Sequence, residues 1–201
     1  MKISKSRILI NSGLIMIILS LLLICYNLQM AYVAGKSSSE VSVKLDKLIG
    51  ARNEASVEAI PDYILNPDMS MPVISVDGWD YIGFLDIPDL NINLPVIEQY
   101  SPQAIKVAPA CYGGTAYKEN FVICAHNYRS HFGLIGQLDE NSIVTFTDAD
   151  GNVFTYKVSD KETLSPKQKA ELFSDQWDLT LVSCTASGQY RIAVRCTKSE
   201  I

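Results

Sequence analysis

Two alternating runs of residues near the C-terminus constrain the fold most strongly. Residues 179–184 read Leu-Thr-Leu-Val-Ser-Cys and residues 190–196 read Tyr-Arg-Ile-Ala-Val-Arg-Cys, which indicates two strands. The five residues between them include Gly188 and are typical of a hairpin loop. Because strand side chains alternate between two faces, pairing Cys184 with Arg191 assigns every other position to a face. One face is then core, with Leu179, Leu181, Ile192, Val194 and Cys196, and the other points outward, with Thr180, Val182, Cys184, Arg191, Ala193 and Arg195.

The outward face combines a thiol with two guanidinium groups. A free cysteine is most often a small buried apolar residue, but that interpretation leaves Arg191 and Arg195 unexplained. A thiol beside a cation is suited to nucleophilic catalysis. Arg191 stands opposite Cys184 in the predicted register, so it is the first candidate for the catalytic cation, and the more distant Arg195 is the second.

His126 is the candidate acid/base and one of only two histidines. It follows the apolar run 121–125, which indicates a buried strand, and it precedes the polar segment 127–131. A histidine that leaves a buried strand lies at the rim of a core, where catalytic groups are commonly found. Alone it would more often be structural, but with Cys184 and Arg191 it completes a catalytic set.

Eight strands are predicted after residue 80, and mostly antiparallel strands in a region of this size can close as one barrel. A turn at 148–152 introduces the sixth strand, and Ser165-Pro166 predicts the start of a short helix through Phe173. The predicted strands are 81–87, 92–97, 104–107, 120–125, 143–148, 153–158, 179–184 and 190–196.

From about Trp79 to the C-terminus, the chain resembles the sortases, the cysteine transpeptidases of Gram-positive cell surfaces. The family's Thr-Leu-x-Thr-Cys signature is similar to residues 180–184, and its Arg-apolar-apolar-Val strand is similar to residues 191–194. Ala125-His126 stands where the family has Gly-His. The segments 81–88, 94–96 and 130–133 also resemble sortase segments, in the family's order. Ser183 replaces the usual threonine and keeps its hydroxyl, while Ala125 replaces the usual glycine, so no positive φ is needed there.

The resemblance implies a closed eight-stranded sortase-type β-barrel with short helices and a thioester mechanism. Cys184 would attack the C-terminal sorting signal of a secreted protein, and Arg191 would position the peptide and stabilise the oxyanion. His126 would protonate the leaving amine and later deprotonate an amine of a cell-wall precursor or a pilin. No metal or cofactor is expected. The expected substrate-binding residues are Thr180, Val182, Ser183 and Ala193.

Two other functions are left open by the sequence: a hydrolytic cysteine protease and, far behind, a non-catalytic surface binding domain.

Ordinary cysteine and histidine titrate near pH ~8.5 and ~6.5, so we expect few molecules to hold the thiolate–imidazolium pair and turnover to be slow. Selectivity is expected from the loop after Ser159 and from the rim around Val182 and Ala193. The Asp-Pro-aromatic lid that resembles pilus-building sortases is not found, which favours the anchoring of surface proteins.

The N-terminus carries an apolar stretch, Ile8 to Leu28, whose 21 residues would extend about 32 Å as a helix and span a bilayer. Three basic residues precede it and no acidic residue occurs before Glu40, so the N-terminus is expected in the cytoplasm and the catalytic domain outside. A cleaved signal peptide is the competing interpretation. The stretch is long for one, and Tyr32 occupies a position that should be small, so an uncleaved single-pass anchor is favoured.

The predicted division is a cytoplasmic tail (1–7), a transmembrane anchor (8–30), a linker or stalk (31–78) and the catalytic barrel (79–201). Within the linker, residues 35–39 are expected to be a flexible spacer and Leu45, Leu48 and Ile49 to begin a short amphipathic helix. The sequence does not decide whether this segment packs on the barrel. All 22 acidic residues follow position 39, so nucleic acid is an unfavourable partner.

The remaining cysteines and acidic residues allow several interpretations. Cys184 and Cys196 lie on opposite faces of the predicted hairpin and should not form a disulfide. Cys111 and Cys124 could pair, although the apolar neighbours of Cys124 favour a buried, reduced thiol. The acidic residues Asp148, Asp150 and Asp160 could bind calcium, but turn formation and solvation are the favoured account.

Overall fold

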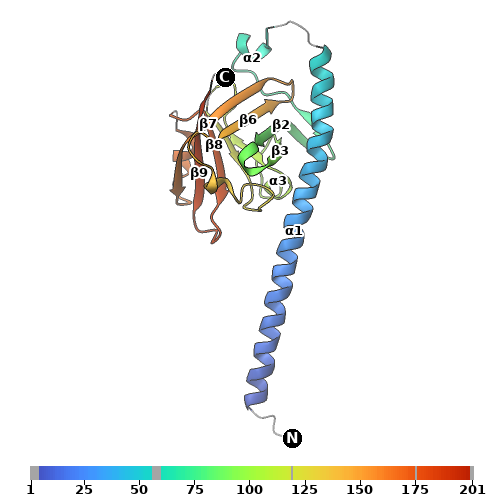
Figure 1. Cartoon of the computed structure of the whole chain (residues 1–201), viewed down its shortest axis with the longest axis vertical. Helices are drawn as coiled ribbons and strands as arrows, with labels where there is room; N and C mark the ends of the chain where they lie inside the picture. The colour runs from blue at the N-terminus through green and yellow to red at the C-terminus, as the bar shows by residue number, and fades with distance from the viewer. Residues whose placement is uncertain (1–4, 56–59, 119, 175, 200–201) are drawn as a thin grey trace. The chain divides into compact units, whose positions relative to one another are not determined.

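The computed structural model describes residues 5–55, 60–118, 120–174 and 176–199. The chain divides into two compact units, residues 1–33 and residues 34–201, which are described separately. One long helix, α1 (Lys5–Ala55), contributes residues to both units (Figure 1).

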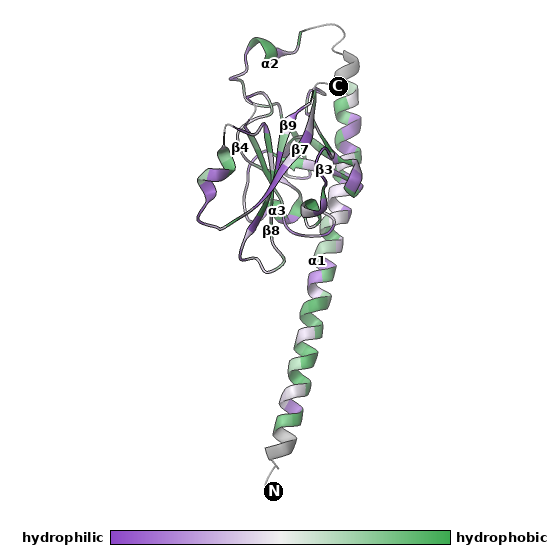
Figure 2. Cartoon of the chain, turned by 60° about the vertical axis from the view of Figure 1, so that its left-hand side comes forward, coloured by the Kyte–Doolittle hydropathy of each residue, from purple (hydrophilic) through white to green (hydrophobic). Residues whose placement is uncertain are grey.

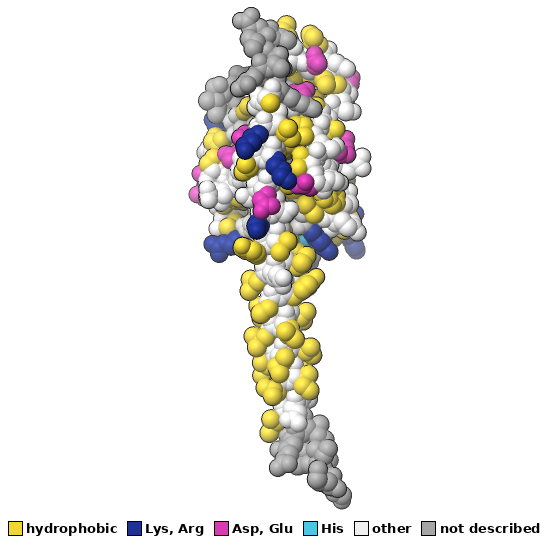
Figure 3. All heavy atoms as spheres, turned by 90° about the vertical axis from the view of Figure 1, so that its right-hand side faces the viewer, with side chains coloured by type: hydrophobic (Ala, Val, Ile, Leu, Met, Phe, Trp, Pro, Cys, Tyr) yellow, Lys and Arg dark blue, Asp and Glu magenta, His cyan; other side chains and the backbone are white. Residues whose placement is uncertain are grey.

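The first unit is the N-terminal part of α1, and its described side chains are almost all exposed and apolar. Large side chains such as Leu14, Leu19 and Leu23 are each more than half exposed, and Figure 3 shows yellow side chains all along this part of the helix. The hydroxyl groups of Ser12 and Ser20 donate to backbone carbonyls three residues earlier, at 2.9 and 2.8 Å. A helix that is apolar on every side is suited to a membrane rather than to water. Among the described residues, this is the one helix long and apolar enough to cross a bilayer.

The second unit is a closed β-barrel, as predicted. Its strands follow the order β2-β3-β4-β5-β8-β9-β7-β6, and a further pairing of β2 with β6 closes the ring. The β3–β4 and β5–β8 pairs are parallel and the others are antiparallel. A short strand, β1 (Ile74–Val76), adds to β2. The barrel strands are β2 (Trp79–Ile87), β3 (Ile92–Ile97), β4 (Ala110–Gly113), β5 (Phe121–Cys124), β6 (Ile143–Asp148), β7 (Val153–Leu164), β8 (Leu179–Cys184) and β9 (Arg191–Lys198).

Gly83 marks the point where β2 is paired on both edges. Its φ is +149°, and a Cβ atom built there would lie 2.0 Å from the carbonyl oxygen of Thr147 on β6. A register shift in the β2–β3 ladder occurs between Tyr81 and Gly83. Only glycine permits this close approach of backbones, and such irregularities are how a sheet bends into a barrel.

The barrel interior is filled by alternate strand residues. Phe121, Ile123, Leu181 and Val194 belong to the main core cluster, together with Cys196. Cys196 is fully buried, and all five cysteines are free, as hairpin parity predicts for Cys184 and Cys196. The outer face of the same strands carries a second, smaller cluster, described below with the candidate site.

The predicted third strand is wrong. Residues 104–107 form a short helix, α3 (Ala104–Val107), and the strand follows at β4. The Ser101 hydroxyl accepts the amide of Ala104 at 2.9 Å, and Pro109 follows the helix. Because β3 and β4 pair in parallel, the chain between them must cross over, and a helix provides that connection. A short apolar run cannot by itself distinguish strand from helix.

The predicted helix after Ser165 is shorter and later than expected. Strand β7 continues to Leu164, and a 3-10 helix, η3, covers Lys169–Phe173. The amide of Ser165 donates instead to the side-chain oxygen of Gln168 at 2.8 Å. The other short helices are α2 (Asp62–Leu65), η1 (Pro88–Leu90) and η2 (Ile135–Gln137).

The predicted flexible spacer at 35–39 is also wrong, because these residues are helical within α1. In residues 34–51, Figure 2 shows hydrophilic and hydrophobic residues interspersed along the helix. One face is buried, with Ala34 and Ser38 followed by the cluster residues Val41, Leu45 and Ile49, which pack with Ile74, Tyr81 and Ile97 of the barrel. The predicted amphipathic character is thus present, with Leu45 buried and Leu48 exposed. This part of the chain packs on the barrel and is not a free stalk.

Candidate active site

The three candidate residues belong to neighbouring segments of the sheet. The parallel β5–β8 register pairs Cys124 with Val182 at the end of β5, and continuing it by two residues aligns His126 with Cys184. The two segments stay side by side there, because the amide of Ala125 donates to Val182 (3.0 Å) and the Asn127 side chain donates to Thr185 (3.3 Å). On the other side, Cys184 pairs with Arg191, as the hairpin predicts. Continuation of the β5–β8 register thus aligns His126, Cys184 and Arg191 in one row, called here the candidate row.

Two further rows lie on the same outer face of the barrel, and the expectation that they are exposed is wrong. Val182 and Ala193 pack with Leu164 and Leu172 of the 164–173 segment, which covers them. Thr180 and Arg195 are also buried, with 2% and 1% of their surface exposed. By contrast, all three residues of the candidate row are partly exposed. The two covered rows are Cys124–Val182–Ala193 and Val122–Thr180–Arg195.

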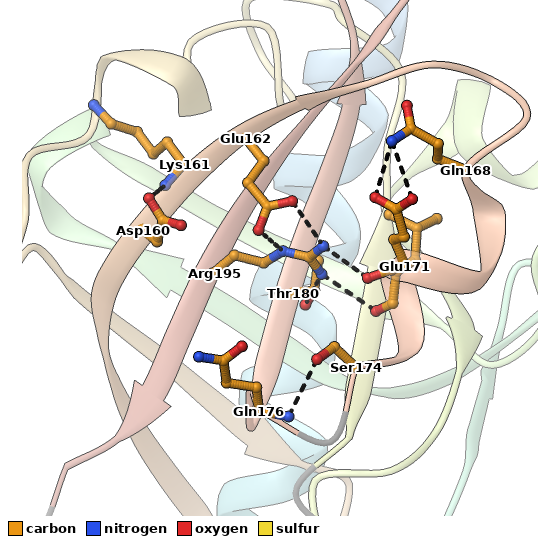
Figure 4. A network of polar contacts seen from close by, with 10 residues as sticks. Asp160, Lys161, Glu162, Gln168, Glu171, Ser174, Gln176, Thr180 and Arg195 are labelled. Carbon is orange, nitrogen blue, oxygen red and sulfur yellow. Dashed lines mark hydrogen bonds and ion pairs between the residues drawn. The ribbon is translucent and has the colours of Figure 1, made fainter.

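The guanidinium of Arg195 is buried and makes its hydrogen bonds within the protein fold. Its guanidinium donates to both oxygens of the Glu162 carboxylate at 3.3 Å, and to the hydroxyl of Thr180 at 3.1 Å. It also donates to the carbonyls of Glu171 (2.7 Å) and Leu172 (3.4 Å), as Figure 4 shows. The side chain thus fastens the 162–172 region to β8. Arg195 is therefore not available as a second candidate for the role of Arg191, and Thr180 is its partner rather than a substrate contact.

A cavity of about 250 Å³ opens beside the candidate row. Cys184, Arg191 and Ser183 line one part, and Val182 lines its floor with Cys124. Of the four expected substrate-binding residues, Val182 and Ser183 line the cavity, whereas Thr180 and Ala193 are buried outside it. His126 is not a lining residue, although its neighbour Ala125 is.

Several cavity residues were missed by the sequence analysis. Tyr100 and Tyr112 supply aromatic surface, with ring centroids 4.9 Å apart, and Leu164, Lys169 and Leu172 are also lining residues. Tyr112 belongs to β4, which was assigned elsewhere, and Leu164 ends a polar stretch that carries little strand signal. A selectivity loop was expected from the sequence directly after Ser159, but β7 continues to Leu164, and the cavity-lining part of the segment begins there.

Arg191 lines the cavity and also contacts the loop between β8 and β9. Its Nη1 atom donates to the carbonyls of Gly188 and Tyr190, both at 3.1 Å. The planar fork carries five donors in total, so Nη2 and Nε have donors to offer a peptide carbonyl or an oxyanion. The loop contacts hold the cation at the cavity rim.

His126 is half-buried and stacked on Tyr128, with ring centroids 4.1 Å apart and planes 15° apart. Burial lowers the pKa of His126; the Asn127 side chain opposes this shift and the positive charge of Lys106 adds to it. Both burial and Lys106 disfavour the imidazolium. The direction matches the expectation that few molecules hold a protonated histidine near neutral pH.

Two further thiols, Cys111 and Cys124, belong to the strands β4 and β5. Burial raises the pKa of Cys124 to about 12 and that of Cys111 to about 11. A thiol with a raised pKa is a weak nucleophile near neutral pH.

The carboxylate of Asp148, considered above as a calcium ligand, accepts hydrogen bonds from other groups of the protein. Asp148 accepts the amides of Asp150 and Asn152, both at 2.9 Å, and the hydroxyl of Tyr117 at 2.7 Å. This is turn formation by a buried aspartate. Across the described residues, no group of three His, Cys, Asp or Glu side chains is arranged to hold a metal ion.

Comparison with known proteins gives a consistent result. A family model described as "Sortase domain" matches residues 85–199. The sortase D5 transpeptidase of Clostridium perfringens is similar in structure, with a TM-score of 0.57 and 18% identity over 84% of this chain and 99% of that chain. Sortase C of Clostridium perfringens, solved with the C-terminal cell wall sorting motif, has a TM-score of 0.55 and 24% identity over 88% and 96%.

A third similar structure is sortase C1 of Streptococcus agalactiae, with a TM-score of 0.55 and 20% identity over 78% of this chain and 90% of that chain. At these identities the structural likeness shows the fold alone. A comparison with curated protein sequences gave no match.

Proposed function

Because the chain belongs to the sortase family of cysteine transpeptidases, we propose that it cleaves a C-terminal sorting signal of secreted proteins and transfers the acyl group to an amine. The observation that carries this proposal is the candidate row of His126, Cys184 and Arg191 beside a cavity of about 250 Å³. A nucleophile, an acid/base and a cation on adjacent strands are the groups that acyl transfer through a thioester needs.

In the first half of the reaction, the Cys184 thiolate attacks the scissile carbonyl and a C–S bond forms. Arg191 stabilises the negative charge that develops on the carbonyl oxygen. His126, as imidazolium, gives its proton to the departing amine as the C–N bond breaks. The product of this half is a thioester on Cys184 and a free amine fragment.

In the second half, an amine of a cell-wall precursor or a pilin attacks the thioester. His126, now neutral, takes the proton that the amine loses, and Cys184 leaves as the thiolate. The enzyme therefore returns to its starting protonation state, so no cofactor is consumed. Attack by water instead of the amine would make the enzyme a hydrolytic protease.

The cavity supports recognition of an apolar side chain of the sorting signal. Val182, Leu164 and Leu172 supply apolar surface, and Tyr100 and Tyr112 supply an aromatic wall. Apolar walls with a few polar groups are typical of peptide and small-molecule sites. The polar groups here are Arg191, Ser183 and the Cys184 thiol, which lie where the scissile peptide would be.

We further propose that residues 8–30 anchor the enzyme in the cell membrane, with the N-terminus in the cytoplasm and the catalytic barrel outside. The support is the exposed apolar surface of α1 and the basic residues Lys2, Lys5 and Arg7 that precede its apolar stretch in the sequence. Sorting signals and cell-wall amines are found on that side of the membrane.

The test uses the full chain in detergent micelles with peptides of the Leu-Pro and Asn-Pro types and an oligoglycine amine. We expect mass spectrometry to detect an acyl-enzyme on Cys184 and a peptide–oligoglycine product, and Cys184→Ala to yield neither. Release of free acid at a rate independent of the amine would identify a hydrolase. If no thioester and no product formed across a broad peptide panel while the Cys184→Ala protein bound the same peptides, a binding domain would be the better description.

A further inference from the structure

The second histidine of the chain, His131, is fully buried and belongs to the same loop as His126. Its Nε2 atom lies 3.2 Å from the hydroxyl of Ser38 on α1. That hydroxyl donates to the carbonyl of Val107 at 2.7 Å, so its single hydrogen is already used. Nε2 must then donate to Ser38, which fixes the tautomer and the orientation of the ring.

His131 is connected to His126 through one aromatic ring. Its ring centroid lies 5.7 Å from that of Tyr128, which stacks on His126 at 4.1 Å. The loop backbone closes over the same residues, because the carbonyl of Tyr128 accepts the amides of His131 and Gly133, both at 2.9 Å. A shift of His131 would therefore displace Tyr128 and the ring stacked on it.

Helix α1 meets this loop at close range. A Cβ atom at Gly35 would lie 2.8 Å from the Cβ of Ser130, so a glycine is needed for the helix to lie this near. One turn further along, Ser38 contacts His131, and beyond it Val41 and Leu45 pack against the barrel. The helix is thus a rigid support on which the loop 126–133 rests.

Protonation does not explain the role of His131. Burial lowers its pKa to about 4; the carbonyls of Ala34 and Ile105 oppose the shift, and the charge of His126 adds to it. The titratable groups that face it are His126 and Tyr128 of its own loop, while α1 and α3 present Ser38 and backbone carbonyls. His131 therefore stays neutral near neutral pH and carries no positive charge that could act on His126.

We propose that His131 is a positioning residue for His126, and that Ser38 of α1 holds His131 in the orientation that the reaction requires. This inference rests on the proposed function, since it assigns a structural support to the acid/base of that reaction. Small displacements of a positioned acid/base are costly, with about 1 Å able to lower a rate about a hundredfold. The alternative is a buried contact that stabilises the fold without affecting His126.

The first experiment compares two serines of the same helix face. Ser42 is also buried and donates to a backbone carbonyl, that of Asn93 at 3.2 Å, but it lies away from the loop 126–133. Ser38→Ala and Ser42→Ala are measured in the full chain in detergent micelles, for transfer kinetics and for the free energy of unfolding. We expect Ser38→Ala to lower kcat about tenfold with little change in KM, and Ser42→Ala to leave kcat within about twofold.

A second experiment uses His131 itself. His131→Gln keeps an N–H donor near the position of Nε2, whereas His131→Leu removes it. We expect His131→Gln to retain a larger share of kcat than His131→Leu. The loss in His131→Leu should be accompanied by a change in the pH–rate profile, because the environment of His126 changes.

A third comparison adds Gly35→Ala, which should lower kcat, and Ser130→Gly in the same chain, which should restore it.

The outcomes are distinguishable. If kcat follows the free energy of unfolding across all variants, or if Ser38→Ala and Ser42→Ala behave alike, His131 is only a stabilising residue and the inference is wrong. If the unmodified chain forms neither thioester nor transfer product, the proposed function is wrong, and the positioning role that rests on it is wrong too. A selective loss in Ser38→Ala with an active unmodified chain supports both.

Discussion

The chemical roles of two arginines on one strand face are decided by what covers them. Arg191 ends the candidate row at the cavity rim, whereas Arg195, two rows deeper, donates to Glu162, Thr180 and backbone carbonyls. We expect Arg191→Ala to abolish detectable transfer while the melting temperature changes little. Steady-state transfer assays and thermal melts of the same preparations check both quantities.

Arg195→Leu should show the opposite behaviour. Removal of the Arg195 guanidinium leaves the carboxylate of Glu162 and two backbone carbonyls without their hydrogen-bond donor. We therefore expect the free energy of unfolding to fall by about 3 kcal/mol. Denaturant titration measures this loss, with Arg191→Leu as the matched control. Full stability in Arg195→Leu, or full activity in Arg191→Ala, would contradict the assignment.

The buried ring of His131 predicts a pH dependence of stability. Its pKa falls from an ordinary 6.5 to about 4 in the folded chain, so the unfolded chain binds more protons between these values. The free energy of unfolding should therefore keep its full value above pH 6.5 and decrease as the pH falls toward 4. His131→Gln should flatten this part of the curve, as urea titrations at several pH values would show. An equally steep decrease in His131→Gln would assign the effect to other groups.

At the scale of residues, the sequence predicted well where strand parity alone decides. The pairing of Cys184 with Arg191 and the core position of Cys196 follow from alternation within one hairpin. The exposure of Thr180 and Arg195 was predicted wrongly, because the segment that covers them comes from residues 164–173. Parity assigns a face, but only tertiary structure shows what packs on it.

At the scale of elements, the packed part of α1 offers a direct test. Leu45 is fully buried against the barrel, and Leu48, three residues on, is 46% exposed. We expect Leu45→Ala to lower the free energy of unfolding by about 2–5 kcal/mol, because it leaves a cavity at a buried site. Leu48→Ala on the same helix should change it by less than about 0.5 kcal/mol. Equal, small losses in denaturant titrations would mean that this part of the helix does not stabilise the barrel.

Elements were predicted correctly where apolar alternation is long and wrongly where it is short. The ranges of β3, β6 and β8 coincide with the predicted strands. The four residues of α3 carry too little pattern to distinguish helix from strand, and the parallel β3–β4 pair that requires a crossover is not visible locally. Residues 35–39 are small and polar, which favours a linker in isolation, yet in the fold Gly35 and Ser38 permit close packing on the loop 126–133.

At the scale of the whole molecule, the two compact units should be separable by function. The first unit, residues 1–33, carries the proposed anchor, and Ala34 is the first buried residue in the described part of α1. Deletion of residues 2–30 should therefore move the protein from the membrane fraction to the soluble fraction, with an unchanged kcat on soluble peptides.

A longer deletion separates anchoring from positioning. Removing residues 2–43 also removes Gly35, Ser38 and Ser42 but keeps Leu45 and Ile49. This protein should be equally soluble, yet its kcat should fall at least as far as that of Ser38→Ala, because the loop 126–133 has lost its support. Sedimentation after carbonate extraction and transfer assays measure the two properties independently. A pelleted 2–30 deletion would contradict the proposed anchor, and equal kcat in both deletions would contradict the support by α1, so one pair of chains tests the proposed link between α1 and His126.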